Sequence, residues 1–315
     1  MPNQPLVSIV TPSYNQAAFL EQTIQSVLDQ DYPNLEYIIV DGSSSDGSQE
    51  IIKKYADRLT WWVSEPDHGQ AEAINKGLAH GRGEIVAWLN SDDYYLPGAI
   101  AAAVAALNSA PDTGLVYGDV LAVDGNGKII NTLRYKEWKL IDLMCFNIIG
   151  QPAVFFRKEL FDKAGQLNTY YHCMLDHQLW LRMAGLAPIH YVPELWAAAR
   201  FHAAAKNIAQ APEFGREAYE VVSWMRSQTN LGELYQQAHS KIWAGVHRLN
   251  GRYLSEGGQP GKALRSYANS FLAYPPTVFQ DWKRIVFTAF SLFGFNQIGP
   301  LYRRYQQKQQ AKHAN

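Results

Sequence analysis

Two neighbouring carboxylates in the first third of the sequence could bind a metal ion. Asp92 and Asp93 follow an apolar run and are preceded by Asn90 and Ser91. Mg²⁺ and Mn²⁺ prefer carboxylate oxygens, and a cation bound to a diphosphate needs only one or two of them because phosphates and water supply the rest. The same residues could instead cap the next helix, since Asp is a common capping residue. Taken alone, the motif leaves both interpretations open.

Three further residues could hold a nucleoside. Asp41 closes a second apolar run, where an acid can accept hydrogen bonds from a ribose or base. Tyr14 offers an aromatic face for a base, and Asp67 follows a third run. Asp41-Gly42 is also an ordinary turn sequence, and exposed loop tyrosines are common. The nucleoside interpretation therefore depends on these side chains lying together.

Asp176 and His202 are candidates in the second half of the chain. Asp176 lies in a segment in which Leu175, Leu179 and the stem of Arg182 recur at helical spacing. An acid in a first helical turn is often only a favourable partner of the helix dipole. As a general base, however, Asp176 would take the proton of an acceptor hydroxyl. His202 follows an expected strand, and a lone histidine is more often structural.

Strands and helices that alternate over the first 110 residues predict how these groups are positioned. The expected strands are Leu6 to Thr11, Leu35 to Val40, Thr60 to Ser64 and Ile85 to Leu89. Helical spacing between them predicts a mostly parallel α/β sheet with helices on both faces. Ligands bind at the carboxyl ends of such strands, so the polar residues after these strands should meet at one edge.

The rest of the chain divides into a second α/β half and a helical region. A hairpin is expected to turn at Asp124 to Gly127, with a further strand over Ala153 to Arg157. Beyond about 210 the pattern is helical, and residues 240–275 resemble one tetratricopeptide-like hairpin. We therefore expect an α/β domain over 1–208, with a nucleoside half to about 112 and an acceptor half over 113–208, and a helical extension over 209–315.

Composition and charge restrict the classes of protein. The formal net charge is -1, but residues 282–315 contain six Lys or Arg and no acid, which leaves 22 basic against 29 acidic residues in the remainder. Two cysteines are too few for a disulfide framework, and neither a signal segment nor an apolar stretch of ~20 residues is evident. We expect a cytoplasmic protein that binds no nucleic acid, because the basic residues cluster only in the tail.

The C-terminal segment has an amphipathic pattern. Trp282, Ile285, Val286, Ala289, Phe290 and Phe293 recur on one side of a helix, and Phe287 and Leu292 widen that side. Together with the basic residues, this pattern predicts peripheral contact with an anionic membrane surface. Packing of the same side on the rest of the protein is the alternative.

The ordered set of motifs resembles the family 2 glycosyltransferases, which are inverting enzymes with a glycosyltransferase A fold. The matching segments are 10–15, 39–43 with Asp46 and Gly47, 65–69, 73–77, 89–93, Gln151-Pro152, 176–182 and 200–206. The resemblance covers roughly residues 5–207. It implies transfer of a sugar from a nucleoside-diphosphate sugar, with a UDP-sugar favoured, to a sugar or lipid-linked sugar in bacterial surface polysaccharide or glycan synthesis.

Carried over position by position, the resemblance implies a role for each candidate. The nucleotide-sugar-binding residues are Thr11, Tyr14, Asn15, Asp41, Asp67, Asn90 and Ser91. Asp92 binds Mn²⁺ or Mg²⁺ as the last acid of an Asp-any-Asp motif, with His202 near the metal and diphosphate. Asp176 is the catalytic base, and Gln151 and Trp180 lie towards the acceptor.

The sequence departs from the family pattern at two positions. Asn90 stands where the first acid of the Asp-any-Asp motif is usual, which removes a negative charge that Asp93 could replace. Leu175 stands where an acid commonly precedes the base, so Asp176 lacks a like-charged neighbour to raise its pKa.

Three other classes of protein remain as alternatives. A catalytically silent sugar-nucleotide-binding or scaffolding homologue is disfavoured because Asp92 and Asp176 are both present. A nucleotidyltransferase would begin with a glycine-rich basic loop, whereas this loop reads Thr11 to Gln16. A dehydrogenase lacks its Gly-x-Gly-x-x-Gly signature after the first strand.

Overall fold

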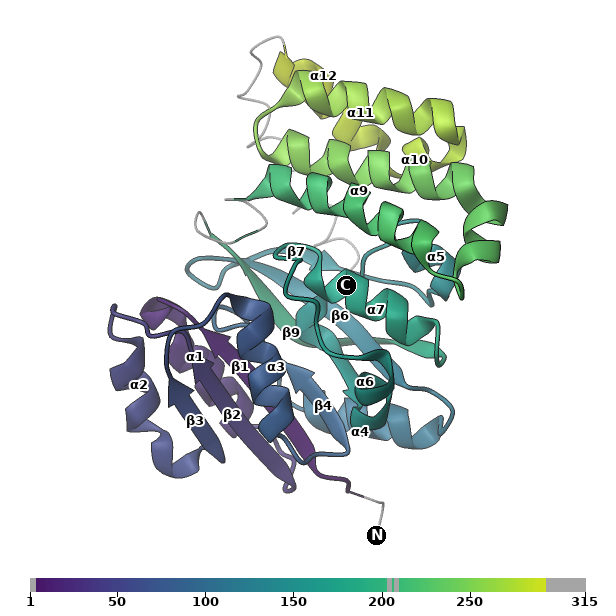
Figure 1. Ribbon diagram of the computed structural model, residues 1–315. Helices are drawn as coiled ribbons and strands as arrows, with labels where there is room; N and C mark the ends of the chain where they lie inside the picture. Colours follow the sequence, from purple (N-terminus) through teal and green to yellow (C-terminus); the bar gives the residue numbers. More distant parts are fainter. Residues whose placement is uncertain (1–3, 203–205, 207–209, 293–315) are drawn as a thin grey trace, which may run out of the picture. The chain divides into compact units, whose positions relative to one another are not determined.

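The computed structural model describes residues 4–202, 206 and 210–292, which form two compact units (Figure 1). The first contains the described residues up to Val123 together with Thr132–Lys139 and Ile149–Arg200. The second contains Asp124–Asn131, Leu140–Ile148 and the described residues from Phe201 onward. The structure thus divides the chain at Arg200 rather than 208, and two short segments of the expected acceptor half belong to the helical unit.

A sheet of nine strands forms the centre of the first unit, in the order β3-β2-β1-β4-β8-β6-β9-β5, with β7 paired to β6. The strands are β1 (Val7–Ser13), β2 (Leu35–Asp41), β3 (Trp61–Ser64), β4 (Ile85–Trp88), β5 (Tyr94–Tyr95), β6 (Leu115–Asp124), β7 (Ile129–Leu133), β8 (Val154–Arg157) and β9 (Ile189–Phe201). The expected strands all form, and their ends differ by one or two residues.

The strands β1 to β4 pair in parallel, whereas β8 and β5 pair antiparallel with their neighbours. β1 pairs in parallel with β2 and β4, and β2 with β3. β8 is antiparallel to β4 and β6, and β5 is antiparallel to β9. The sheet is therefore mixed, and the parallel strands predicted for the first 110 residues are β1 to β4. The predicted hairpin is present, since the Asp124 amide donates to Lys128 and the Gly127 amide to Asp124.

Helices cover both faces of the parallel strands because successive side chains of a strand point to opposite faces. Val7 and Ile9 share a buried cluster with α1 (Ala17–Leu28), α2 (Ser48–Lys54) and α4 (Ala99–Ser109). On the other face, Val10 lies against α3 (Gln70–His80), and Trp88 stacks on Trp180 of α7 (Leu175–Ala184) at 5.1 Å and 20°. Figure 1 shows α3, α6 (Lys158–Ala164) and α7 in front of the strands.

A closed polar network joins the amino ends of β1, β2 and β4. Ser8 Oγ donates to Glu36 Oε2 at 2.6 Å, and the amide of Gly83 donates to Ser8 Oγ at 2.8 Å. The Arg82 amide and guanidinium donate to the same carboxylate at 2.8 and 2.7 Å. Burial favours a higher pKa for Glu36, but these hydrogen bonds outweigh it and hold the pKa below its usual value.

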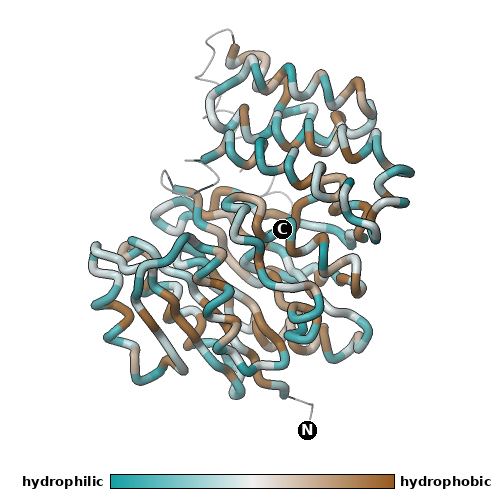
Figure 2. Tube along the Cα trace, viewed as in Figure 1, coloured by the Kyte–Doolittle hydropathy of each residue, from teal (hydrophilic) through white to brown (hydrophobic). Residues whose placement is uncertain are grey.

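The second unit is helical, as predicted. Its helices are α5 (Leu140–Met144), α9 (Ala211–Ser227), α10 (Gly232–Glu256), α11 (Pro260–Ala273) and α12 (Trp282–Leu292), with a 3₁₀ turn over Pro275–Asp281. α10 and α11 form the predicted hairpin: Tyr267 packs on Gly251, and Ser270 Oγ donates to the Ala244 carbonyl at 2.7 Å. These helices alternate between brown and teal in Figure 2, as expected for amphipathic helices packed on one another.

The predicted apolar side of the C-terminal helix divides between two surroundings. Ile285 packs on Leu254, Ala263 and Tyr267, whereas Trp282, Val286 and Phe290 are exposed. Phe293 and the basic residues beyond it lie outside the described residues. No helix in the described parts of the chain combines the length and apolar character needed to cross a membrane.

Candidate active site

The carboxyl ends of β1, β2 and β3 bring Tyr14, Gly42 and Asp67 together. Tyr14 is 63% exposed. A Cβ atom on Gly42 would lie 2.8 Å from Asp67 Oδ2, closer than real Cβ contacts allow, and 3.3 Å from the Tyr14 ring, which is tight. Only glycine lets these two side chains approach the backbone between them. An aromatic face, a carboxylate and a bare backbone therefore line one edge, as a nucleoside site requires.

Asp41 organises the loop beside this edge. Its buried carboxylate accepts hydrogen bonds from the Ser44 amide and hydroxyl, at 2.9 and 2.6 Å, and from Ser64 Oγ at 2.7 Å. Asn15 has a positive φ of 50° and is hydrogen-bonded to the same loop. Its backbone amide donates to Ser44 Oγ, and its side-chain Oδ1 accepts from the Ser45 amide. Asp41 and Asn15 thus shape the loop.

Thr11 lies inside β1 rather than after it. The strand continues to Ser13, so Thr11 shares the face of Val7 and Ile9 and is fully buried. Its hydroxyl lies 2.9 Å from the Tyr37 hydroxyl. The Thr11 side chain thus supports the strand, and contact of this residue with the nucleoside stays a prediction.

A tightly held turn follows β4 at the same edge. Asn90 Oδ1 accepts from Gln70 Nε2 at 2.6 Å, which fixes the orientation of the Asn90 amide. Thr23 Oγ1 contacts the carbonyl oxygens of Ser91 and Asp93, at 3.0 and 2.6 Å. Ser91 is buried and Asp92 half-buried. The backbone of the predicted metal-binding turn is therefore set before a ligand arrives.

Arg200, at the end of β9, also holds this turn. Its amide donates to Asp93 Oδ1 and its Nε to the Asp92 carbonyl, both at 2.9 Å. Its guanidinium donates to Gln22 Oε1 at 2.7 Å and lies over the Phe19 ring. The sequence placed Arg200 only within a matching segment, because its partner Asp93 is 107 residues away in the chain.

Asp93 cannot replace the charge that Asn90 lacks. Its carboxylate is buried, and Oδ1 accepts a hydrogen bond from the Arg200 backbone amide. Asn90 Nδ2 lies 3.4 Å from the other carboxylate oxygen. Burial and the neighbouring Asp92 raise the pKa of Asp93 well above its usual value. Asp92 is left as the carboxylate of this turn that fits a divalent cation. One carboxylate and a nearby amide suit a cation whose other ligands are phosphates and water.

Two buried polar atoms at this edge have no hydrogen-bond partner among the described residues: Ser13 Oγ and Gln151 Oε1. Gln151 precedes β8 and donates from Nε2 to the Trp88 carbonyl at 2.8 Å, so it lies at the end of β4. Buried polar groups are normally paired, and each exception needs an explanation. A ligand bound at the edge would provide one.

Trp180 is a core residue. It is 1% exposed, stacks on Trp88 and meets Phe156 edge to face at 5.7 Å. The apolar spacing of α7 had suggested a helix but not which side chains are covered. The expectation that Trp180 faces an acceptor is therefore not consistent with its position.

Asp176 lies in the first turn of α7, between two residues that define its surroundings. One turn later Trp180 meets the last residue of β4, and four residues earlier His172 approaches Gly69, the residue before α3. Asp176 is half-buried, and its Oδ1 accepts from the His177 amide at 2.7 Å. The base candidate thus lies at the carboxyl edge of the sheet. No pattern in the sequence indicated His172, which lies near the same edge through its approach to Gly69.

His202 belongs to the second unit. It follows β9 directly and precedes residues outside the described part of the chain. Its predicted role near the metal therefore stays a prediction.

These features define an α/β domain with a preformed polar edge at the carboxyl ends of its parallel strands. A model of glycosyl transferase family 2 matches residues 8–174, more than half of the chain, and the chain therefore belongs to this family.

Curated relatives agree with this assignment. An uncharacterised glycosyltransferase of Rickettsia conorii is 31% identical over 62% of this chain and 34% of its own length. TuaG of Bacillus subtilis, provisionally described as a teichuronic acid biosynthesis glycosyltransferase, is 45% identical over 29% of this chain and 37% of its own. The chain thus spans about a third of the length of these relatives.

Solved structures share the fold. Residues 1–349 of S. aureus TarS, in complex with UDP-GlcNAc, match with a TM-score of 0.60 and 16% identity over 89% of this chain and 92% of that one. The mannosyltransferase PcManGT of Pyrobaculum calidifontis, in complex with GDP-Man and Mn²⁺, matches with a TM-score of 0.64 and 20% identity over 97% and 84%. The fold is the predicted glycosyltransferase A fold.

Proposed function

We propose that the protein is an inverting glycosyltransferase that moves a sugar from a nucleoside-diphosphate sugar to an acceptor hydroxyl. The observation that carries this proposal is the meeting of Tyr14, Gly42 and Asp67 at the edge that also holds Asp92. The Tyr14 ring would stack on the base, and Asp67 would accept hydrogen bonds from the nucleoside. A UDP-sugar is the favoured donor.

The chemistry proposed for the site is a single displacement. An acceptor oxygen bonds to the anomeric carbon as the bond to the diphosphate oxygen breaks, and the electron pair leaves with the diphosphate. Asp176 accepts the proton of the acceptor hydroxyl. Asp92 would hold a Mn²⁺ or Mg²⁺ ion, and such an ion would supply positive charge to the leaving group. Arg200, Thr23 and Gln70 keep the Asp92 turn in place through hydrogen bonds to the Asp92 carbonyl, the Asp93 carbonyl and Asn90 Oδ1.

Donor and pathway are inferred from relatives. TarS and PcManGT, with UDP-GlcNAc and GDP-Man, support a nucleotide-sugar donor, and PcManGT supports a divalent metal. TuaG supports a place in the synthesis of a surface polysaccharide, with a sugar or lipid-linked sugar as acceptor.

A screen of sugar nucleotides with Mn²⁺ tests the proposal. We expect UDP-sugars to raise the melting temperature and at least one to be hydrolysed slowly. A ligand at 100 times its dissociation constant stabilises by ~2.7 kcal/mol, which is readily measured. Binding without turnover by any donor would favour a silent sugar-nucleotide-binding homologue. No binding at all would remove both interpretations.

We also propose that α12 contacts an anionic membrane surface peripherally. The exposed side chains Trp282, Val286 and Phe290 recur every four residues, and Lys283 is exposed beside them. Flotation with anionic vesicles at low salt tests this, and Trp282→Ser/Phe290→Ser should reduce the bound fraction. Neutral vesicles serve as the control. Failure of the parent chain to float would show that this surface has another role.

A further inference from the structure

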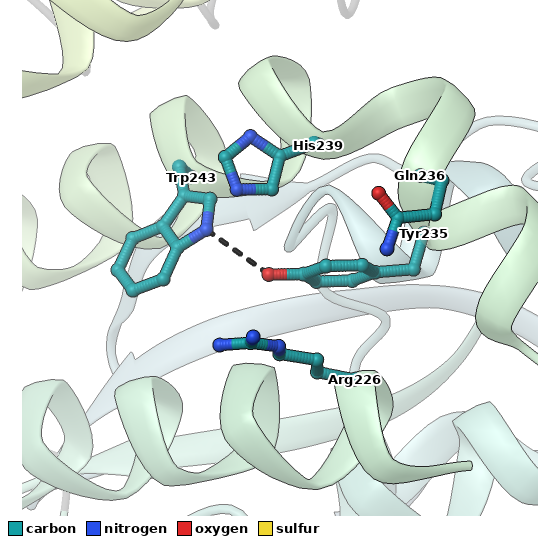
Figure 3. Close-up of a pocket in the computed structure, with 5 residues that line it drawn as sticks. All are labelled: Arg226, Tyr235, Gln236, His239 and Trp243. Atoms are coloured by element: carbon teal, nitrogen blue, oxygen red, sulfur yellow. Dashed lines mark hydrogen bonds between the residues drawn. The ribbon is translucent and has the colours of Figure 1, made fainter.

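A pocket of about 490 Å³ lies in the second unit (Figure 3). It is lined by Arg226 of α9 and by Tyr235, Gln236, His239 and Trp243 of α10. Its volume is within the range of small-molecule sites, roughly 300–1,000 Å³. None of these residues belongs to the transfer site of the first unit.

Aromatic rings form the fixed part of this pocket. Trp243 Nε1 donates to the Tyr235 hydroxyl at 3.2 Å, and the His239 ring meets the Tyr235 ring edge to face at 5.5 Å and 87°. Trp243 also contacts the rings of Tyr219 and His247, at 6.2 and 5.8 Å. Because neighbouring rings hold them, Tyr235 and Trp243 lose little freedom when a ligand binds.

The polar side chains of the pocket differ in how far the described residues hold them: His239 contacts the Tyr235 and Trp243 rings, whereas Arg226 and Gln236 are open to a ligand. Arg226, Gln236 and His239 are exposed. In the described parts of the chain, no carboxylate lies within ion-pair distance of Arg226, and the Gln236 amide has no hydrogen-bond partner. Figure 3 shows Arg226 and His239 on opposite sides of the Tyr235 ring. Cationic and amide donors therefore surround an aromatic centre.

We propose that this pocket binds a sugar residue of an anionic acceptor glycan, an assignment that rests on the proposed function. The apolar C–H face of a pyranose would pack on the half-buried Trp243 ring, since Tyr235 is only 3% exposed, and the sugar hydroxyls match the amide and imidazole groups. A guanidinium pairs with a carboxylate through two parallel hydrogen bonds, which favours a uronic acid over a neutral sugar. A second hold on the acceptor raises its effective concentration at the transfer site.

Binding of two tetrasaccharides to the full chain tests this proposal: tetragalacturonate as the anionic probe and cellotetraose as the neutral one. The test variant is Arg226→Ala/Gln236→Ala. Its matched control is Gln237→Ala, which removes the same kind of side chain from the next, exposed position of α10 outside the pocket. All three substituted positions lie on the surface, and melting temperatures verify folding.

We expect tetragalacturonate to bind the parent more tightly than cellotetraose does. The double variant should weaken its affinity by at least about tenfold, the effect of losing a charge-assisted hydrogen bond. Gln237→Ala should stay within about twofold of the parent, as surface substitutions usually do. No binding to the parent, or equal binding to the double variant, would overturn the proposal.

Two further measurements separate the possible failures. UDP with Mn²⁺ is titrated into the same samples: loss of saccharide binding with intact nucleotide binding overturns the pocket alone. Saccharide binding without nucleotide binding supports the pocket and removes the proposed function. Hexaglutamate is the third probe, and equal affinity for it would show that the pocket selects charge rather than sugar, which overturns the assignment.

Discussion

The two ends of the parallel strands in the first unit differ in how they use polar side chains. At the amino ends, Ser8, Glu36 and Arg82 satisfy one another, and the amide of Gly83 completes the network. At the carboxyl ends, Tyr14 is open to solvent and Ser13 Oγ and Gln151 Oε1 are buried without a partner among the described residues. Polar groups at the amino ends are therefore paired with one another and stabilise the unit, whereas several at the carboxyl ends remain available to a ligand. Substitutions at the two ends should therefore change different properties.

The largest effect is expected for the base at the carboxyl edge. Asp176→Asn should lower turnover at least ~100-fold, because the loss of general base catalysis removes a factor of that size. Affinity for UDP with Mn²⁺ should be nearly unchanged, since the base acts on the acceptor. Steady-state rates and nucleotide titrations measure both. Turnover within about tenfold of the parent would place the base elsewhere.

Loss of the metal-binding carboxylate should be the next largest effect. Asp92→Ala should weaken UDP binding with Mn²⁺ by roughly 10- to 100-fold, and Asn90→Ala by less, because the amide only steadies the surroundings of the ion. Calorimetry with and without a chelator measures the difference. Equal binding of UDP under both conditions would contradict the metal role.

A smaller effect is expected for Arg200→Lys. Lysine keeps the charge but loses the fork that contacts the Asp92 carbonyl and Gln22 together. UDP binding with Mn²⁺ should weaken up to about tenfold, while binding without metal stays close to the parent. If both weaken equally, Arg200 stabilises the unit rather than positioning the metal-binding turn.

At the amino ends, Glu36→Gln should reduce stability and leave nucleotide binding intact. Removal of a buried, hydrogen-bonded carboxylate costs about 1–3 kcal/mol. The pKa of Glu36 is lowered in the folded state, so its contribution is present above the unfolded pKa of about 4.3 and disappears as pH falls through the folded pKa.

Urea unfolding of the parent and Glu36→Gln at several pH values measures this contribution, and the gap between them should narrow on acidification. Glu84→Gln is the matched control, since Glu84 is exposed at the same end of the sheet. A gap that persists at low pH would mean that packing, not charge, makes the difference.

The sequence predicted the elements well because their signals are local. Apolar periodicity gave β1 to β4, the helices between them and the α10–α11 hairpin, since each pattern is contained within one segment. No local pattern indicated the strand directions beyond the hairpin, because they depend on pairings between β8, β4 and β6 that are distant in the chain.

By itself, the sequence determined the family, the alternation of strands and helices, and the set of polar residues at the carboxyl ends. Only the tertiary structure decided which of these side chains form hydrogen bonds within the protein and which remain at the edge. Thr11 contacts Tyr37, Asp41 accepts from Ser64, and Asp93 accepts from Arg200, whereas Tyr14 and Asp67 remain at the edge. The partners are 23 to 107 residues apart. Residue type determines what a side chain can bind. The partner that it binds in the folded protein depends on which distant atoms the fold brings within hydrogen-bond distance.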